Sequence, residues 1–316
     1  MDLHLINVTI ENSTADTFGL LGPSVAELHL IKCTASEVFL NPFVIALVIE
    51  DSNVSEVIPH CVGQNETFNV EEIHFRNTQI ASFPRNISRL TKLKKIMCIE
   101  SKLRMLDFDS LSNLKELEII TFCDSFISEV VNNKLMELPK LTLVNLSRNQ
   151  ISHIPTTKWN TPLLLYLLLD NNNLRQFPQI KHFPRIELIS LNYNTITNID
   201  MEDVSGMEHL HTICLRGNQL LHLEASAKIH LPSLGYLNVD HNRLRVLDIS
   251  KWNVPALNVL NVSNNQLRMI VDFESLADTL TLFNATDNPW DCEWALFTMV
   301  DFKMSIQSEW AKACLV

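Results

Sequence analysis

The sequence lacks most of the features that mark catalysis or a membrane span. Only 6 of its 316 residues are glycine, and no low-complexity linker interrupts a chain that is 46% hydrophobic, so one large continuous core is expected. The longest apolar run, residues 43–49, is far shorter than the roughly 20 residues that a transmembrane helix needs. The patterns G-x-S-x-G, H-E-x-x-H, the P-loop and C-x-x-C are all absent, so neither an enzyme nor a cofactor is expected.

Charge is also unbalanced toward one sign. The chain has 25 basic and 36 acidic residues, a formal net charge of −11. An excess of acidic groups argues against nucleic acids and anionic membranes as partners.

What the sequence has instead is one motif repeated along the chain. The frame L-x-x-L-x-L-x-x-N-x-L fits Leu164, Leu167, Leu169, Asn172 and Leu174. Six other copies carry the ninth-position asparagine as Asn149, Asn194, Asn218, Asn242, Asn265 and, in a degraded form, Asn288. From Leu146 onward the sixth positions are 23, 22, 24, 24, 23 and 23 residues apart. This spacing is typical of the leucine-rich repeat.

The repeat predicts a stack of coils with two kinds of contact between neighbours. Leucines at positions one, four, six and eleven fill the interior, and the coils stack as a one-dimensional array. Each coil turns after its short strand and leaves backbone groups facing inward. A buried amide both donates and accepts, so the asparagines are expected to form a ladder between coils; its members are Asn149, Asn172, Asn194, Asn218, Asn242 and Asn265.

The first half follows the frame less closely. Its ninth positions are Cys33, Ser52, Thr78 and Ser101, and the frame loosens near residues 114–127. We expect an α/β solenoid, a leucine-rich repeat horseshoe with a parallel concave sheet of about 13 strands. The array is assigned to residues 1–286, with an incomplete first unit, and a C-terminal flanking cap to residues 287–316.

The end of the chain resembles the C-terminal flanking cap of extracellular leucine-rich repeat proteins. The resemblance rests on Asn288-Pro289-Trp290, Cys292, a short apolar helix-like run and Cys314. It implies a disulfide between Cys292 and Cys314. The usual cap has a C-x-C pair, but Trp294 holds the second position here, so a reduced cap with one bridge is expected.

Seven cysteines leave at least one without an intramolecular partner if the chain is oxidised. Cys33 is either a buried thiol or bridged to Cys61. An exposed thiol at Cys123 or Cys214 would be able to link two chains. Cys214 also lies near His209, His211 and His241 on adjacent repeats, but scattered surface histidines explain this better than a metal site, so no metal is expected.

Eight N-x-S/T sequons favour an extracellular protein. Three, at Asn145, Asn261 and Asn284, lie within the repeat frame and follow from it. The other five are independent of the frame: Asn7, Asn12, Asn53, Asn65 and Asn86. Met1 is followed by DLHL, which is no signal peptide, so the chain is either mature or trimmed, or secretion is not its route.

Outward-facing strand positions predict a recognition surface. All three tyrosines of the chain map to the concave face, beside leucines and a valine. The expected contact residues are Leu143, Tyr166, Leu168, Leu188, Tyr193, Tyr236 and Val259. Tyrosine is favoured at interfaces because it combines a large rigid contact area with a polar tip. The alternative is that β-propensity alone put aromatic residues on strands.

Two functions are consistent with these features. The repeats and reduced cap resemble insect extracellular leucine-rich repeat proteins, including the mosquito leucine-rich immune family. This resemblance implies a secreted recognition protein of innate immunity that binds a protein partner, such as a complement-like protein, or itself. The alternative is a trimmed ectodomain of a Toll-like or adhesion receptor. An intracellular scaffold is disfavoured by the cap and the sequons.

Overall fold

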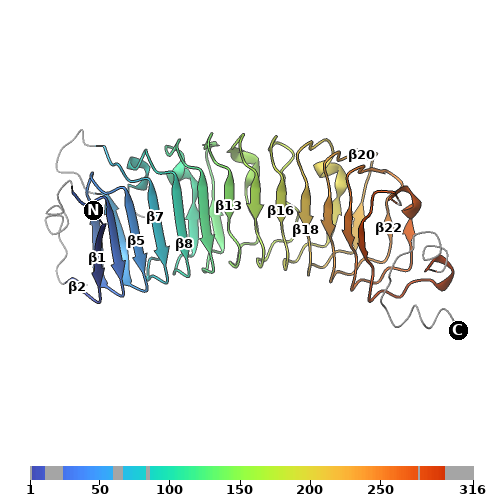
Figure 1. Cartoon of the computed structure of the whole chain (residues 1–316), viewed down its shortest axis with the longest axis horizontal. Helices are drawn as coiled ribbons and strands as arrows, with labels where there is room; N and C mark the ends of the chain where they lie inside the picture. The colour runs from blue at the N-terminus through green and yellow to red at the C-terminus, as the bar shows by residue number, and fades with distance from the viewer. Residues whose placement is uncertain (1, 11–23, 60–66, 83–85, 277, 296–316) are drawn as a thin grey trace. The chain divides into compact units, whose positions relative to one another are not determined.

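The computed structural model describes residues 2–10, 24–59, 67–82, 86–276 and 278–295. The chain forms two compact units, Met1–Leu164 and Leu165–Val316. One kind of parallel strand, which we call the main strand, recurs seven times in the first unit and six times in the second (Figure 1). The predicted count of about 13 strands is confirmed.

In the first unit the main strands pair in parallel with the repeat frame in register. Position four of each coil is matched to position four of the next, for example Leu28 to Leu47, Leu47 to Ile73 and Ile73 to Ile96. The main strands are β1 (Asp2–Ile6), β3 (Glu27–Ile31), β5 (Ala46–Glu50), β7 (Glu72–Arg76), β8 (Lys95–Ile99), β10 (Ile119–Cys123) and β13 (Leu143–Asn145).

Residues 114–127 differ from the expectation of an irregular unit. Ile120 pairs with Ile96 on one side and with Val144 on the other, so it occupies position four of a regular coil. Phe122 and Ser125 then fall at positions six and nine, both buried. The frame is obscured in the sequence because a phenylalanine and a serine replace the usual leucine and asparagine.

Other strands and 3-10 turns cover the side of the first unit opposite the main strands. Three strands, β2, β4 and β6, form one parallel sheet, and the others pair as β9 with β11 and β12 with β14. These elements are β2 (Thr9–Ile10), β4 (Thr34–Leu40), β6 (Asn53–Pro59), β9 (Met105–Asp107), β11 (Glu129–Val131), β12 (Met136–Glu137), β14 (Trp159–Asn160), η1 (Ile87–Arg89), η2 (Phe108–Leu111) and η3 (Thr156–Lys158).

The second unit repeats this plan with shorter main strands: β15 (Tyr166–Leu168), β16 (Leu188–Ser190), β18 (Thr212–Cys214), β21 (Tyr236–Asn238), β24 (Val259–Asn261) and β26 (Leu282–Asn284). The remaining strands pair as β17 with β19, β20 with β23 and β22 with β25. These are β17 (Asn198–Asp200), β19 (His222–Glu224), β20 (Ile229–His230), β22 (Leu247–Asp248), β23 (Trp252–Asn253) and β25 (Ile270–Val271), with η4 (Met201–Val204) and η5 (Phe273–Leu276).

The expected α/β class needs a correction to a β-solenoid. Across the described residues, no helix between main strands exceeds four residues, and each is a 3-10 turn. Repeats of 22 to 24 residues spend about half their length on the main strand and the turns beside it. The rest must span the coil in an extended form, since an α-helix rises only about 1.5 Å per residue.

Asparagines hold adjacent coils together from inside the turn. The Asn242 amide donates to the carbonyls of Leu215 and Val239, at 2.9 and 3.0 Å, and its Oδ1 accepts from Leu220 N at 3.0 Å. Asn194, Asn218, Asn265 and Asn288 make the same three bonds in the second unit. Each amide therefore bridges two carbonyls and one N–H across neighbouring coils.

The ladder of the first unit has fewer hydrogen bonds because most of its ninth-position side chains are shorter than asparagine. Asn149 makes the full set, with Ile127 N, Phe122 O and Leu146 O. Ser52 Oγ accepts from Cys33 N and contacts the carbonyl of Leu30. A hydroxyl has one proton to donate where an amide has two, so fewer inward carbonyls are satisfied.

The residue before each ladder position lies in the left-handed region. In the second unit these are Asn171, Tyr193, Gly217, His241, Asn264 and Asp287, with φ between 52° and 67°. The N–H of this residue donates to the coil that follows, as in Tyr193 N to Arg216 O at 2.7 Å. A left-handed residue costs free energy for most side chains, which explains the frequent Asn, Asp and Gly.

Aromatic side chains cover the end of the second unit. Trp290 is buried, donates from Nε1 to Ala285 O at 2.7 Å, and stacks on Trp294 with ring centroids 4.6 Å apart. Trp294 also meets Phe273 edge-on at 6.0 Å. The tryptophan that replaces a cap cysteine in the sequence thus packs against the last coil, and the chain becomes helical at residues 292–295.

Candidate recognition surface

The solvent-facing side of the main strands, here called the sheet face, carries a continuous row in the second unit. Strand register brings position three of each coil beside the next: Tyr166, Leu188, Thr212, Tyr236, Val259 and Leu282. The first five are half-buried and Leu282 is exposed. Apart from Thr212 the row is apolar or aromatic, so the register unites residues that lie up to 116 positions apart.

Both tyrosines of this row are held by polar neighbours. Tyr166 OH donates to Glu187 Oε2 at 3.2 Å, and this hydrogen bond with the carboxylate raises the pKa of the phenol. Asn238 Nδ2 donates to Tyr236 OH at 3.3 Å. The rings are therefore oriented before any partner arrives, which reduces the entropy lost on binding.

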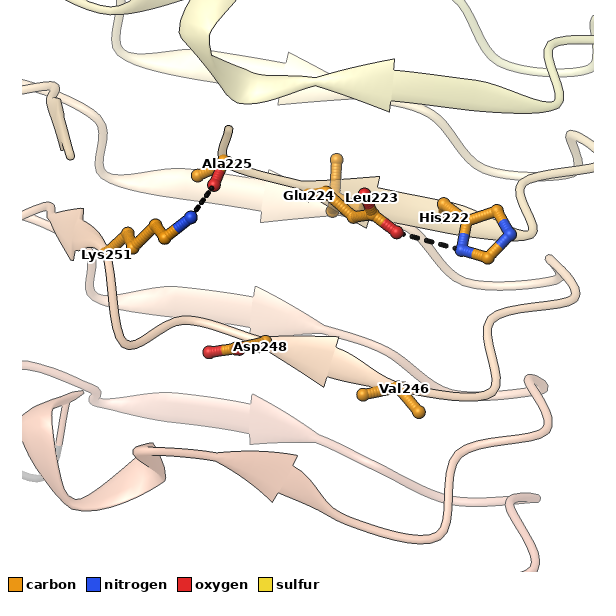
Figure 2. Close-up of a pocket in the computed structure, with 7 residues that line it drawn as sticks. All are labelled: His222, Leu223, Glu224, Ala225, Val246, Asp248 and Lys251. Atoms are coloured by element: carbon orange, nitrogen blue, oxygen red, sulfur yellow. Dashed lines mark hydrogen bonds and ion pairs between the residues drawn. The ribbon is translucent and has the colours of Figure 1, made fainter. Parts of the chain in front are cut away.

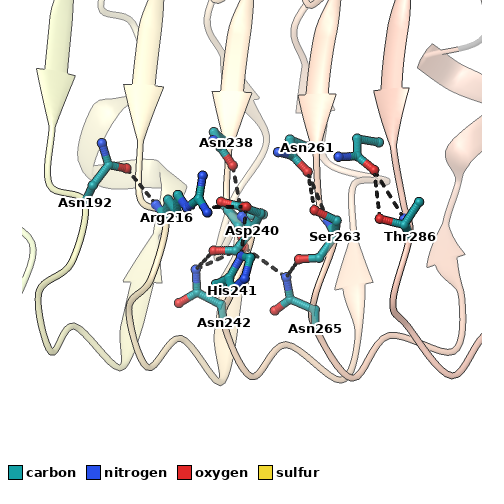
Figure 3. A network of polar contacts seen from close by, with 12 residues as sticks. Asn192, Arg216, Asn238, Asp240, His241, Asn242, Asn261, Ser263, Asn265 and Thr286 are labelled. Atoms are coloured by element: carbon teal, nitrogen blue, oxygen red, sulfur yellow. Dashed lines mark hydrogen bonds and ion pairs between the residues drawn. The ribbon is translucent and has the colours of Figure 1, made fainter.

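A polar network borders the apolar row toward the turn (Figure 3). Asn238 and Asn261 accept hydrogen bonds from backbone N–H groups two residues on, at Asp240 and Ser263. Asp240 is only 4% exposed and lies among Arg216 and His241, with Nε–Oδ2 at 3.6 Å and Nδ1–Oδ2 at 2.9 Å. Arg216 and Asp240 are not among the predicted contact residues, and their only sequence signal is a pair of charges at position seven of adjacent repeats.

Tyr193 is not on a strand but in the turn after β16. Its φ is 55°, and 48% of the residue is exposed. The ring lies against Gly217 of the next coil, and the Arg216 guanidinium is 5.8 Å from its centroid. The structure thus separates Tyr193 from the row of Tyr166 and Tyr236 and places it with the polar network.

The other expected contact residues fall in different places. Leu168 and Val259 are half-buried on the sheet face of the second unit, while Leu143 is half-buried on β13 of the first unit. In the first unit, Lys94 pairs with Glu71 at 2.7 Å, each directly before a main strand, and Lys115 pairs at 3.1 Å with Glu137 of β12, off the main strands.

The thiols are less available than the sequence suggested. Cys33 is free and buried, and its Sγ donates to the carbonyls of Leu5 and Ile31, so the alternative of a bridge to Cys61 is wrong. Cys61 itself lies outside the described residues. Cys123, expected to be exposed, is buried, and burial raises its pKa to about 11.

Cys214 is half-buried, and burial also raises its pKa to about 11. Few thiolates therefore form at neutral pH, and the thiolate is the species that forms disulfides. Cys292 is disulfide-bonded, whereas its expected partner Cys314 lies outside the described residues. The pairing of these two cysteines stays a prediction.

The sequons outside the repeat frame differ in accessibility. Asn7, Asn53 and Asn86 are exposed. Asn12 and Asn65 lie outside the described residues. Asn145 and Asn261 are half-buried, and their side chains accept hydrogen bonds from Ser147 N and Ser263 N, each at 3.1 Å.

A pocket also lies away from the sheet face. A pocket of about 290 Å³ is lined by His222, Leu223, Glu224, Ala225, Val246, Asp248 and Lys251, from β19, β22 and the residues beside them (Figure 2). His222 pairs with Glu224 at 3.0 Å, and Lys251 Nζ donates to Ala225 O at 3.0 Å. Its strongest polar groups are thus already paired inside the chain.

The part of the chain that the structure describes contains no group of three or more His, Cys, Asp or Glu residues able to hold a metal ion. It also contains no helix with the length and apolarity needed to span a bilayer.

The repeat, the strand register and the asparagine ladder define a leucine-rich repeat protein. The family model described as "Leucine rich repeat" matches residues 208–267. Rat osteomodulin is 20% identical over 207 residues, covering 56% of this chain and 48% of that protein. Human podocan-like protein 1 is 26% identical over 209 residues, covering 57% and 41%. The chain spans about half the length of the curated relatives it matches.

Solved structures of low sequence identity share the fold. A chain of the octameric complex of Latrophilin 3, Unc5D and FLRT2 is 19% identical, with a TM-score of 0.61, covering 91% of this chain and 84% of that one. The leucine-rich repeat domain of APL1B is 16% identical, with a TM-score of 0.56, covering 92% and 84%. The plant peptide hormone receptor RGFR1 in complex with RGF2 is 18% identical, with a TM-score of 0.53, covering 91% and 57%.

Proposed function

We propose that this protein is a secreted recognition protein that binds a protein partner over the sheet face of its second unit. The row from Tyr166 to Leu282 carries the proposal, because contiguous apolar surface on a soluble protein usually marks a contact site. Aromatic anchors with oriented hydroxyl groups are typical of the residues that dominate binding energy. Two of the similar structures are complexes, one of Latrophilin 3, Unc5D and FLRT2 and the other of RGFR1 with RGF2.

Two observations support an extracellular setting. Asn7, Asn53 and Asn86 are exposed sequons. Cys292 is disulfide-bonded, and disulfides persist in oxidising compartments. The proposal includes a bridge from Cys292 to Cys314 and a cap formed by residues 287–316, whose first part covers the last coil through Trp290.

A role in innate immunity is part of the proposal and rests on the resemblance of the repeats and the reduced cap. The likeness to APL1B, at 16% identity, supports the fold alone. The alternative is a Toll-like or adhesion receptor ectodomain. The encoded protein beyond Val316 discriminates the two: a hydrophobic span of about 20 residues favours the receptor.

The sheet-face proposal is tested with the double variant Tyr166→Ala, Tyr236→Ala. Burying one tyrosine in an interface is commonly worth about 2 kcal/mol, or roughly thirtyfold in affinity, so the double variant should lose the partner that the wild type captures from native fluid. The matched control is Phe43→Ala, Phe126→Ala, which removes two aromatics that are 47% and 48% exposed and lie off the main strands.

Melting temperature is measured for both double variants, so that loss of binding is separated from loss of folding. If the tyrosine variant folds and still captures the same partner as the wild type, binding does not use this face. Equal loss in the phenylalanine control would also contradict the proposal.

A further inference from the structure

A cluster at the turn end of the sheet face has features that the fold itself does not require. Tyr193, Arg216 and Asp240 come from three successive coils of the second unit. Backbone hydrogen bonds fix their spacing, from Tyr193 N to Arg216 O at 2.7 Å and from Gly217 N to Asp240 O at 2.9 Å. Three side chains of different chemistry are thus held in one row.

Asp240 anchors the cluster. Its Oδ2 lies 3.6 Å from Arg216 Nε and 2.9 Å from His241 Nδ1, and the side chain is 5% exposed. Its Oδ1 is buried and finds no hydrogen-bond partner among the described residues. A buried carboxylate with an unused oxygen costs stability.

The equivalent carboxylate three coils earlier behaves differently. Asp170 Oδ1 accepts from Ser190 Oγ at 2.6 Å and from Asn192 N at 2.7 Å. Asp170 therefore ties coils together, as a structural residue should. Asp240 makes neither bond, and its contacts instead position Arg216 and His241.

Arg216 keeps the outer end of its guanidinium free. Its Nε faces Asp240, its side chain is 44% exposed, and no described residue accepts from the two Nη groups. The same guanidinium lies over the exposed ring of Tyr193, with 5.8 Å to the centroid. Cation–π contact on one side and a carboxylate on the other restrict the rotamers of Arg216.

We propose that Arg216 binds a carboxylate of an aspartate or glutamate side chain on a protein partner, with Asp240 and Tyr193 as positioning residues. This rests on the proposed function, since the partner occupies the neighbouring sheet face. The free Nη pair presents two parallel N–H donors, which match a carboxylate bidentately. The exposed ring of Tyr193 lies beside the Arg216 guanidinium and provides an aromatic surface for the bound side chain.

Charge favours a carboxylate over a phosphate. Arg216 supplies one positive charge, and Asp240 at 3.6 Å supplies a negative one. A group with nearly two negative charges would be repelled by Asp240 and by a chain of net charge −11. A carboxylate carries only one negative charge, so it accepts hydrogen bonds from Nη1 and Nη2 with less repulsion from Asp240 and from the acidic chain.

The test uses the full chain and two small probes: N-acetyl-glutamate N-methylamide and its neutral isostere N-acetyl-glutamine N-methylamide. NMR follows the Nε–H of Arg216 and the ring of Tyr193 during titration. One bidentate pair supports an affinity of about 1–10 mM, so a saturable shift with the glutamate probe is expected. The glutamine probe should produce none.

Three variants and one further ion sharpen the result. Arg216→Gln should weaken glutamate binding at least about tenfold, and Arg216→Lys should do nearly the same, because lysine lacks the planar fork. The matched control Arg243→Gln, at an exposed arginine of the following coil, should bind as the wild type does. Inorganic phosphate should bind more weakly than the glutamate probe.

Several results would overturn the assignment. They are no saturable shift at Arg216, equal shifts with both probes, unchanged binding in Arg216→Lys, or tighter binding of phosphate. Because no natural partner is used, failure here leaves the capture result of the tyrosine double variant intact. Loss of capture with normal glutamate binding would conversely separate the two sites.

Discussion

The ring of Tyr193 occupies the space that a side chain on Gly217 would need. A Cβ at Gly217 would lie 2.6 Å from Tyr193 Cδ1 and 2.8 Å from Cε1. Gly217 also has a φ of 67°, which favours glycine. Both the backbone conformation and the lack of space for a Cβ therefore require glycine at this position. The position of the exposed Tyr193 ring therefore depends on glycine at residue 217 of the next coil.

Gly217→Ala should displace Tyr193 and lower stability by about 2–3 kcal/mol, from left-handed strain and overpacking together. Gly206→Ala is the matched control, because Gly206 has a φ of 82° with nothing within 4 Å of its Cβ position. It should cost only the strain, about 1–2 kcal/mol. Chemical denaturation measures both; equal costs would show that the ring moves aside freely.

Asn242→Leu should lower the free energy of unfolding by about 1–3 kcal/mol, because Leu220 N and the carbonyls of Leu215 and Val239 lose their partner while remaining buried. Asn258→Leu, at an exposed site at position two of the next coil, should change it by less than about 0.5 kcal/mol. Similar losses at the two sites would contradict the ladder's contribution to stability.

Peptide mapping without reductant should find Cys292 joined to Cys314, with Cys33, Cys98, Cys123 and Cys214 as free thiols. Alkylation of the native protein at pH 8 should be slow, because burial raises the pKa of Cys98 to about 12 and those of Cys123 and Cys214 to about 11. Rapid labelling after unfolding is the positive control. Alkylated Cys292 in secreted material would contradict the proposed bridge.

Glycans are expected at the exposed sequons Asn7, Asn53 and Asn86 when the chain passes through a secretory pathway. Asn261 should be unoccupied if a partner binds the sheet face, because its half-buried side chain lies on β24 within that face. Mass spectrometry after glycosidase treatment measures occupancy site by site. A glycan on Asn261 would crowd the row of Tyr236 and Val259 and argue against a partner there.

Asp109 should stabilise the first unit in a pH-dependent way. Partial burial raises its pKa, but N–H groups of Lys134 and Asn133 and the amide of Asn132 outweigh that and hold the pKa below the ordinary value of an aspartate. A depressed pKa means that the stabilisation is complete above the unfolded value and disappears as pH falls through the folded one.

The variant Asp109→Asn should therefore be less stable than the wild type at pH 7, with a difference that shrinks toward pH 3. Asp278→Asn, at an exposed aspartate, is the control and should show little difference at either pH. Urea unfolding at several pH values measures both. A constant difference for Asp109→Asn would show that the carboxylate charge is not what stabilises the site.

Much of the fold follows from local sequence alone. The fixed interval between Leu146, Leu169 and Leu191 determined the coil length, the strand positions and which residues face inward, because every coil must bury the same positions against its neighbours. The asparagines were assigned to the interior for the same reason, since inward backbone groups need a partner that donates and accepts. Where Phe122 and Ser125 replaced the usual residues, the pattern failed although the coil is regular.

Only the tertiary structure decided how side chains of different coils meet. The contact of Tyr193 with Gly217 and the pairing of Arg216 with Asp240 each join residues 24 positions apart, and no periodic signal in the sequence indicates them. The burial of Cys123 likewise depends on packing between coils. A repeat specifies what each coil shares with the others, whereas a binding site is made of the residues in which coils differ, and their meeting depends on the register of the stack.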